Sequence, residues 1–170
     1  RPRIYNILSL EFSHTKLANL VSPPDIYREL SLADKFWPSG AAETPTCDPQ
    51  HAWNRPAVER FCLLGMGGSF TNFHIDFGGS SVWYHVFKGK KIFYVVPPTA
   101  KNLDIYQVRG GSIIVPSERL FKSCNVPFQV EIFAGMTLLI PAGWIHAVYT
   151  PEDSLVFGGN FLTLNDLAMQ

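Results

Sequence analysis

The sequence predicts a mainly β domain of jelly-roll type with helices at its N-terminal end. From residue 60 onward, short runs rich in β-branched and aromatic residues alternate with glycine-containing turn signals. Many short strands with such punctuation are typical of an antiparallel sandwich or barrel. The preceding residues carry one β-run, one helical pattern and a proline-rich loop. We therefore expect a single domain over residues 1–170, with a helical and loop part (1–60) followed by a jelly-roll core (61–162).

The first elements follow from apolar spacing and helix-boundary residues. Residues 4–12 are rich in aliphatic side chains and predict a strand. Ser22, followed by two prolines, is a candidate helix cap. The apolar residues that then recur at helical spacing are Ile26, Leu30 and Ala33. Pro38 cannot continue a helix, so this helix should end at residues 36–37. Residues 39–56 hold three prolines and predict a long loop.

The remaining elements form most of the predicted sheet structure. Glycines mark the turns between strands, including Gly158-Gly159. Thr99 should cap a short helix between two of the strands, and a last helical stretch is expected at residues 164–169. The expected strands are residues 61–64, 73–77, 81–87, 91–96, 129–133, 137–140, 146–149 and 155–157.

Composition narrows the possible classes of protein. Hydrophobic residues make up 46% of the 170 residues and aromatic residues 14%, which excludes a disordered chain. Lys plus Arg equals Asp plus Glu at 14 each, so the domain gives no electrostatic case for binding nucleic acid. We expect DNA contact only through parts outside this domain. No apolar run reaches the roughly 18 residues of a membrane span, so we expect no membrane association.

The cysteines and the first residue bear on the cellular setting. Cys47, Cys62 and Cys124 form no CxxC pair, which argues against a disulfide framework and against a zinc ribbon. We expect reduced thiols inside a cell. The chain begins with Arg1 and has no initiating Met, so we expect a fragment of a longer protein.

The tripeptide His74-Ile75-Asp76, followed 72 residues after His74 by His146, predicts a metal site. In an extended strand the side chains of residues i and i+2 leave on the same face, so His74 and Asp76 can point into one pocket. A later strand can bring the third ligand. Two imidazoles and one carboxylate form the facial triad of non-haem Fe(II) oxygenases, which keeps the opposite coordination positions open.

A histidine and an aspartate at this spacing are often incidental, and three further features favour a functional site. Gly78-Gly79 follows at once and allows a tight backbone turn beside a pocket. His146 lies on an apolar strand that follows a Pro-Ala-Gly-Trp corner. Lys91 stands in an otherwise apolar run. Together these features make a metal-dependent site the better interpretation.

Lys91 is a candidate anchor for an acidic ligand. If its strand alternates, Lys91 and Phe93 share one face, and a lysine inside a barrel is costly unless a carboxylate meets it. An anionic dicarboxylate such as 2-oxoglutarate would meet that need, and Thr71 could donate a hydroxyl to the same group. The alternative is that Lys91 belongs to a solvated turn with Lys88 and Lys90, and the spacing alone does not decide between the two.

These residues lie in segments that resemble a known family. Residues 71–85 (TNFHIDFGGSSVWYH) resemble the core motif of the Jumonji-C (JmjC) histone lysine demethylases, and residues 140–148 (IPAGWIHAV) are similar to its second half. Residues 6–17 and 158–161 resemble the subgroup shared by the F-box/CXXC-finger and PHD-finger demethylases. The likeness runs nearly end to end and is weakest around residues 108–128.

The resemblance implies a cupin-like double-stranded β-helix and a set of site residues. It implies that His74, Asp76 and His146 bind Fe(II). It also implies that Thr71, Lys91 and Asn6 bind 2-oxoglutarate, and that Tyr84 and Asn160 are catalytic-pocket residues near the co-substrate or the methylated lysine.

The resemblance also implies a reaction and a setting. O₂ and 2-oxoglutarate would be consumed as co-substrates, and a methyl group would leave lysine as formaldehyde. The implied partner is the methylated histone H3 tail of a nucleosome, and the implied location is the nucleus, in transcription regulation. Residues 11–17 favour mono- or dimethylated lysine 36 of histone H3 as the target, whereas residues 87–94 lean toward lysines 9 and 27.

Other functions stay open from the sequence. A JmjC protein hydroxylase would use the same iron and co-substrate but would leave a stable alcohol. A non-catalytic chromatin-binding module would use the pocket only to recruit partners, although the intact His74, Asp76 and His146 speak against it. A cupin-type isomerase is less favoured, because such sites usually carry more imidazoles near the first pair.

Overall fold

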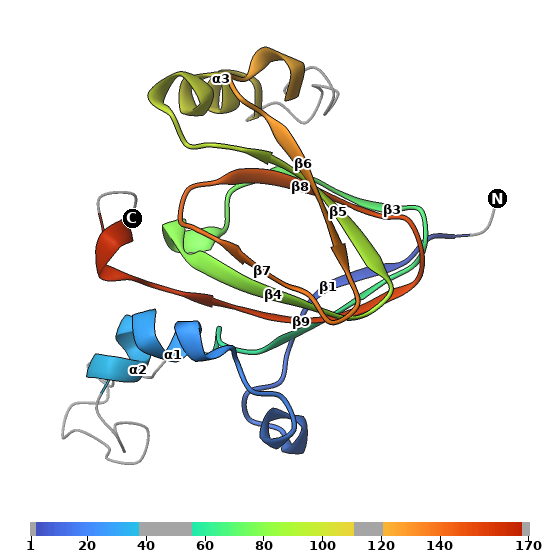
Figure 1. Cartoon of the computed structure of the whole chain (residues 1–170), viewed down its shortest axis with the longest axis vertical. Coiled ribbons are helices and arrows are strands. Elements are labelled where there is room, and N and C mark those ends of the chain that lie inside the picture. The colour runs from blue at the N-terminus through green and yellow to red at the C-terminus, as the bar shows by residue number, and fades with distance from the viewer. Residues whose placement is uncertain (1–2, 38–55, 111–120, 168–170) are drawn as a thin grey trace.

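The computed structural model describes residues 3–37, 56–110 and 121–167, and its strands form two facing sheets (Figure 1). The strands are β1 (Asn6–Glu11), β2 (Phe61–Gly65), β3 (Ser69–His74), β4 (Ser81–Lys88), β5 (Lys90–Val96), β6 (Phe128–Phe133), β7 (Thr137–Ile140), β8 (Ile145–Thr150) and β9 (Ser154–Phe161). One sheet has the order β1-β2-β9-β4-β7 and the other β3-β8-β5-β6. All neighbouring pairs are antiparallel. The predicted jelly-roll class is therefore confirmed.

The helices lie outside the two sheets. The described α-helices are α1 (Asp25–Leu30), α2 (Leu32–Phe36) and α3 (Ala100–Gly110), and short 3₁₀ helices lie at Lys16–Asn19, Phe77–Gly79 and Leu164–Asp166. In Figure 1, α1 and α2 lie on the side of the five-stranded sheet, and α3 lies beyond the other sheet near β6. No described helix has the length and apolarity needed to cross a membrane.

The main core fills the space between the inner faces of both sheets. Val86 and Val156 from the five-stranded sheet are fully buried, and Phe93 from the other sheet is 1% exposed. A second cluster holds the N-terminal helices against the outer face of the five-stranded sheet, because Trp83 packs there with Tyr27 of α1. Burying these side chains stabilises the fold by roughly 1.5–3 kcal/mol each.

The prediction of one continuous helix before Pro38 is wrong, because the structure has two helices there, α1 and α2. The break lies at Ser31, whose backbone is extended (φ −63°, ψ 117°). The Ser31 hydroxyl accepts a hydrogen bond from the Asp34 N–H at 3.3 Å. A serine that caps its own downstream turn competes with helix continuation, and the apolar spacing did not reveal this. The predicted loop at 39–56 lies almost wholly outside the described residues.

The turn predicted at Gly158-Gly159 is also wrong, since both glycines lie inside β9. They are needed there for close approach: a Cβ at Gly159 would collide with the Glu59 carbonyl and the Trp83 ring. The last helical stretch is only a 3₁₀ turn, Leu164–Asp166, in the described part of the tail. The helix after Thr99 is confirmed, with the Thr99 hydroxyl accepting from the Asn102 N–H at 3.2 Å.

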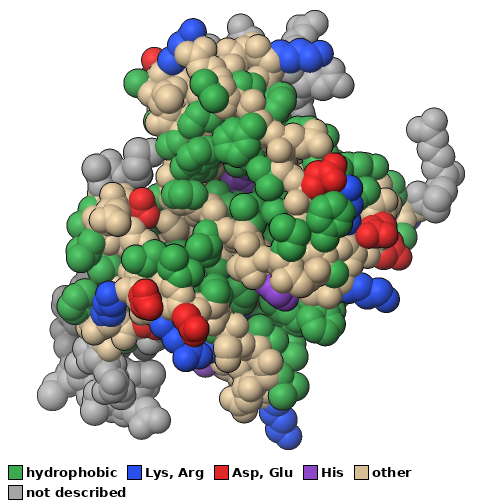
Figure 2. Space-filling model, viewed as in Figure 1, with side chains coloured by type: hydrophobic (Ala, Val, Ile, Leu, Met, Phe, Trp, Pro, Cys, Tyr) green, Lys and Arg blue, Asp and Glu red, His purple; other side chains and the backbone are tan. Residues whose placement is uncertain are grey.

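The described surface carries no concentrated charge on the face that Figure 2 shows. Hydrophobic side chains cover much of the centre of this face, while Lys and Arg side chains are scattered around it singly or in small groups. The described cysteines, Cys62 and Cys124, are buried. The scattered charges agree with the neutral composition.

Candidate metal centre and its pocket

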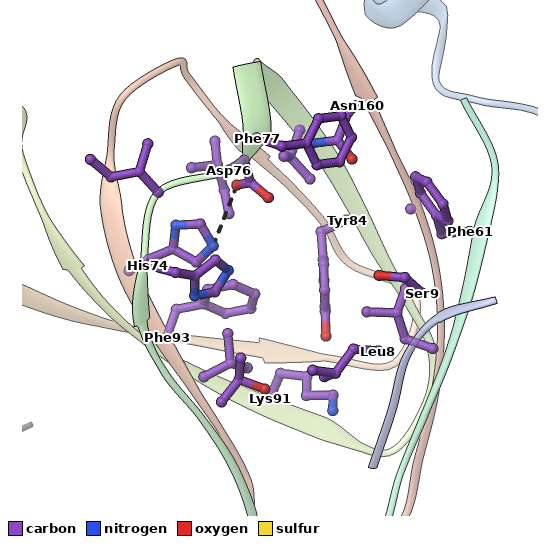
Figure 3. Close-up of a pocket in the computed structure, with 18 of the residues that line it drawn as sticks. Leu8, Ser9, Phe61, His74, Asp76, Phe77, Tyr84, Lys91, Phe93 and Asn160 are labelled. Carbon is purple, nitrogen blue, oxygen red and sulfur yellow. Dashed lines mark ion pairs between the residues drawn. The ribbon is translucent and has the colours of Figure 1, made fainter. Parts of the chain in front are cut away.

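One cavity of about 510 Å³ opens between the two sheets and receives the predicted site residues (Figure 3). Its walls come from both sheets and from the segment that follows β3. Every site residue that the sequence predicted lines this one cavity: Asn6, Thr71, His74, Asp76, Tyr84, Lys91, His146 and Asn160. Segments up to 154 residues apart in the chain, from Asn6 to Asn160, therefore contribute to a single site.

At one end of the cavity, His74, Asp76 and His146 converge. Each offers one possible ligand atom, and these atoms lie within 4.8 Å of one another. His146 Nε2 lies 3.6 Å from an Asp76 carboxylate oxygen. The two imidazole rings have centroids 4.2 Å apart. Two imidazole nitrogens and one carboxylate oxygen gathered this closely fit a divalent transition metal, and the donor set suits ferrous iron.

The backbone brings Asp76 to this end in a different way from that predicted. β3 ends at His74, so Asp76 is not on the strand. Its backbone remains extended (φ −63°, ψ 151°), and a turn at Phe77–Gly79 follows. Gly78 in that turn has a positive φ of 59°, which suits glycine. His74 and His146 are direct partners across the β3–β8 ladder, which sets the two imidazoles side by side.

Backbone carbonyls orient both imidazoles. His74 Nδ1 lies 2.8 Å from the Asn72 carbonyl oxygen, and His146 Nδ1 lies 3.0 Å from the Trp144 carbonyl oxygen. A carbonyl oxygen can only accept, so each Nδ1 carries the proton and donates it. Each Nε2 then presents its lone pair, which is the arrangement that metal-binding histidines need. In both cases the partner is two residues before the histidine.

Burial favours the neutral form of the His146 imidazole. The His146 side chain is 4% exposed, and desolvation lowers its pKa, with the neighbouring His74 lowering it further. Asp76 and the Trp144 carbonyl oppose this shift but do not reverse it. The imidazole is therefore neutral at pH 7, as metal binding requires.

The opposite end of the cavity contains a buried lysine. Lys91 is 3% exposed, and burial lowers its pKa to about 8. Its Nζ donates a hydrogen bond to the Thr150 hydroxyl at 2.7 Å. No carboxylate among the described residues pairs with it. The predicted alternation of β5 is confirmed: Lys91, Phe93 and Val95 are buried, whereas Lys90, Ile92 and Tyr94 are only partly buried. The solvated-turn alternative for Lys91 is therefore wrong.

Thr71 and Asn6 lie together on the cavity wall. The Asn6 side-chain amide donates to the Thr71 hydroxyl at 3.3 Å. In a regular strand, Thr71 and His74 would face opposite sides, because they are three positions apart. The β3–β8 register shifts between these two residues, and this irregularity lets both face the cavity. The sequence spacing alone did not predict the bulge.

Tyr84 and Asn160 line the wall formed by the five-stranded sheet. The Tyr84 ring packs edge-on against Phe93 with centroids 5.0 Å apart, and burial raises the Tyr84 pKa above its usual range. Its hydroxyl therefore stays protonated, and Figure 3 shows it directed toward the end where Lys91 lies. The Asn160 amide donates to the Ser80 hydroxyl at 2.9 Å.

Two hydrogen-bonded contacts fasten the backbone corners beside the metal donors. The Asn160–Ser80 bond holds the segment after Asp76. The Ser81 hydroxyl donates to the Asp166 carboxylate at 2.8 Å and accepts from the Ala142 N–H at 3.1 Å. Ala142 lies in the corner before His146, so the C-terminal 3₁₀ turn supports that corner through Ser81.

The sequence interpretation missed the polar residues behind Lys91. Thr150 accepts the Lys91 hydrogen bond, and Ser69 is its partner across the β3–β8 ladder. The alternation of β8 could have indicated Thr150, because residues 146, 148 and 150 share one face. The register that places Ser69 opposite Thr150 depends on the whole sheet and could not be read from local spacing.

Comparison with known proteins agrees with this geometry. The family described as "JmjC domain, hydroxylase" matches residues 61–161. Lysine-specific demethylase 2B of Mus musculus is 47% identical over 176 residues, and Histone lysine demethylase PHF8 of Danio rerio is 46% identical over 171 residues. Lysine-specific demethylase 2A of Xenopus tropicalis is 42% identical over 177 residues.

Each of these relatives matches 100% of this chain, whereas the chain spans only 13%, 16% and 15% of their respective lengths. The whole-chain identity reaches beyond the matched family region and includes β1 with Asn6. With more than half of its residues in that region, this chain belongs to the JmjC family.

Proposed function

We propose that this chain is the catalytic domain of an Fe(II)- and 2-oxoglutarate-dependent histone lysine demethylase. JmjC membership and relatives named as histone or lysine-specific demethylases support this function. The observation that carries it is a single cavity with a two-histidine, one-carboxylate donor set at one end and, at the other, a buried ammonium that no carboxylate of the described residues pairs with. A metal-chelating dicarboxylate satisfies both ends at once.

The proposed roles follow from the position of each residue. His74, Asp76 and His146 would hold the iron, which when bound supplies the oxidising chemistry that a protein side chain lacks. Lys91 would bind the distal carboxylate of 2-oxoglutarate, with Thr71 and Asn6 adding hydrogen bonds from the neighbouring wall. Tyr84 stays protonated and would donate its hydroxyl toward the co-substrate. Apolar walls such as Phe93 would exclude water.

The reaction we propose removes one methyl group from a lysine side chain in each turnover. O₂ is the oxidant: one of its oxygen atoms hydroxylates an N-methyl carbon to give an unstable hemiaminal, which releases formaldehyde, and the other is incorporated as 2-oxoglutarate becomes succinate and CO₂. The methylated histone H3 tail of a nucleosome is the proposed partner, and the nucleus the proposed location. DNA contact would then come from parts outside this domain, since the chain carries equal numbers of basic and acidic residues.

For the target, we propose mono- or dimethylated lysine 36 of histone H3. The segment Glu11 to Leu17 supports it, through its resemblance to the F-box/CXXC-finger group. Lysines 9 and 27 are the alternative. The relatives named lysine-specific demethylase 2A or 2B and the one named PHF8 differ in specificity, yet they match at similar identities of 42–47%. Overall identity therefore does not select the lysine.

The test is a panel of methylated histone H3 peptides incubated with iron, 2-oxoglutarate and air. We expect a loss of about 14 Da per methyl group and matching formaldehyde, first on the dimethylated lysine 36 peptide. A gain of about 16 Da without formaldehyde would instead identify a hydroxylase, which the family description also names. Mass change on none of the peptides, together with no succinate, would favour a non-catalytic module.

A further inference from the structure

A cluster of buried hydroxyl groups lies behind the Lys91 ammonium, and the roles proposed above do not use it. Thr150 is 1% exposed, Ser69 is 4% exposed and Ser154 is 6% exposed. They come from β8, β3 and β9, respectively. Polar side chains buried to this degree are normally hydrogen-bonded, so each hydroxyl calls for an explanation.

These groups surround the place where Gly65 of β2 lacks a side chain. A Cβ on Gly65 would lie 2.9 Å from Lys91 Nζ, 3.2 Å from Ser154 Oγ and 3.3 Å from Ser69 Oγ. Gly65 lies in a regular strand pair with Ser154 and is not among the glycines with positive φ. Its missing side chain therefore provides space for the ammonium rather than an unusual backbone conformation. We call Ser69, Thr150 and Ser154 around Gly65 the lysine seat.

The hydrogen bonds within the lysine seat are incomplete. An ammonium group has three N–H donors. Lys91 gives one of them to the Thr150 hydroxyl at 2.7 Å, and the described residues contain no carboxylate that takes the others. The Ser69 hydroxyl is buried and has no hydrogen-bond partner among the described residues. Among the described residues, the ammonium has N–H donors without an acceptor and the Ser69 hydroxyl has no partner, which favours an anionic ligand in the adjoining cavity.

We propose that Thr150 is a positioning residue that fixes the Lys91 ammonium in the lysine seat, and that this seat sets where the distal carboxylate of the co-substrate binds. This inference rests on the proposed function and adds the device that holds its lysine. Lysine has a long flexible stem, so an unheld ammonium would lose side-chain freedom when a ligand arrives. The Thr150 hydrogen bond fixes the Lys91 side chain before the ligand arrives, so less conformational entropy is lost on binding and the carboxylate binds more tightly.

The experiment compares Thr150→Val with Thr150→Ser. Valine has nearly the shape of threonine but cannot accept a hydrogen bond, whereas serine keeps the hydroxyl. The probe is 2-oxoglutarate titrated calorimetrically into the Mn²⁺-loaded chain, where no turnover occurs. We expect Thr150→Val to weaken binding about tenfold, the range for one hydrogen bond to a charged group. Thr150→Ser should stay within about twofold of the parent.

A matched control and a kinetic readout separate positioning from general damage. Thr137, on β7, has an exposed hydroxyl that bonds His85 of β4 away from the cavity, so Thr137→Val should not change 2-oxoglutarate affinity. In turnover, Thr150→Val should raise KM for 2-oxoglutarate about tenfold with kcat nearly unchanged, because the metal end is intact. Thr150→Val binding 2-oxoglutarate as tightly as the parent would overturn the inference and leave the proposed function standing.

A second variant carries the test if Thr150→Val does not fold. Gly65→Ala places a methyl group 2.9 Å from Lys91 Nζ, and only the end of a flexible side chain has to move. We expect a several-fold weaker 2-oxoglutarate affinity with unchanged Mn²⁺ affinity. Unchanged 2-oxoglutarate affinity of Gly65→Ala would contradict the lysine seat. A parent chain that binds Mn²⁺ but no 2-oxoglutarate would instead overturn the co-substrate assignment of the proposed function.

Discussion

The two ends of the cavity hold their polar groups in different ways, although β3 and β8 contribute to both. At the metal end, His74 and His146 face each other across the β3–β8 ladder and Asp76 lies just beyond β3, so strand pairing and a backbone corner place the donors. At the lysine end, Lys91 lies within β5, and the hydroxyls of Thr150 and Ser69 surround its ammonium. The metal end therefore depends on backbone geometry and on the hydrogen bonds that orient the imidazoles, whereas the lysine end depends on a buried charged group.

This difference indicates how each end should respond to change. Carbonyl oxygens already orient the imidazoles of His74 and His146, so the metal end is a preformed set of neutral and anionic donors. At the lysine end, the buried ammonium of Lys91 has no carboxylate partner among the described residues, and this uncompensated charge lowers the free energy of unfolding. Variants at the metal end should mainly change metal binding, whereas removing the Lys91 charge should lower co-substrate affinity and raise stability.

The largest effect should come from removing a metal donor. His146→Ala deletes one of the three converging ligands, and we expect Mn²⁺ affinity to fall at least about 100-fold and succinate formation to reach background. His85→Ala is the matched control, because His85 bonds Thr137 and does not line the cavity. Metal titration followed by a succinate assay checks both variants. Unchanged succinate production by His146→Ala would assign the turnover to a contaminant.

Removing the buried charge should separate binding from stability. Lys91→Met keeps most of the apolar volume, so 2-oxoglutarate affinity should fall about 10–100-fold while the free energy of unfolding at pH 7 rises by about 1–2 kcal/mol. Lys90→Met is the control on the other face of β5, where Lys90 pairs with Glu131 at 2.7 Å. Calorimetry and urea unfolding provide the two measurements. A less stable Lys91→Met protein would contradict the account of the lysine end.

The pH dependence follows from the lowered pKa of Lys91. The ammonium is needed to bind the carboxylate, and burial lowers the pKa of Lys91 to about 8. Affinity for 2-oxoglutarate should therefore be full below pH 8 and fall up to about tenfold per pH unit above it. Tyr84, the other titratable group facing this end, stays protonated because burial raises its pKa.

The same shift gives the stability of the ligand-free protein a defined sign. The unfolded chain has the ordinary lysine pKa of 10.5 and so binds more protons than the folded chain between pH 8 and 10.5. The Lys91 contribution therefore makes the folded state more stable as pH rises through this window.

The control for the pH dependence of 2-oxoglutarate affinity is Lys90→Met. This variant keeps Lys91, so its affinity profile should keep a midpoint near pH 8, as in the parent.

The smallest effect should come from the corner beside His146. Asp166→Ala removes the acceptor for the Ser81 hydroxyl, which in turn holds the Ala142 N–H. We expect a loss of about 1–2 kcal/mol in unfolding free energy and a few-fold weaker metal affinity, with 2-oxoglutarate affinity of the metal-loaded protein unchanged. Asp104→Ala, at an exposed position on α3, should change none of these values. Equal effects of the two variants would show that the corner does not depend on Asp166.

The strands and part of the cavity lining could be predicted from local sequence patterns. Alternation in β5 correctly placed Lys91 and Phe93 inside, and period-two spacing brought His74 and Asp76 to one end even though β3 stops at His74. The assignment of metal and co-substrate roles to these residues stays a prediction that the experiments above address. Local patterns therefore sufficed for these residues, whereas Asn6, Tyr84 and Asn160 were assigned to the pocket only through the resemblance to the JmjC family.

The sequence did not predict how these residues are held. The bulge between Thr71 and His74 and the pairing of Ser69 with Thr150 are properties of strand register, which involves residues about 80 positions apart. The sequence predicts a turn at Gly158-Gly159 because glycine occurs both in turns and where two backbones approach closely, and the local sequence does not distinguish the two cases. Tertiary contacts decide between these alternatives.

The most direct test of the account is an anaerobic Fe(II) titration of the parent chain, repeated with 2-oxoglutarate. If the converging donors leave open positions for a chelating co-substrate, adding 2-oxoglutarate should produce a charge-transfer absorption near about 500 nm. That band should be lost in His146→Ala and should need far more 2-oxoglutarate in Lys91→Met. Iron that binds tightly while 2-oxoglutarate produces no band would contradict the central claim that one cavity joins a metal centre to a carboxylate-binding lysine.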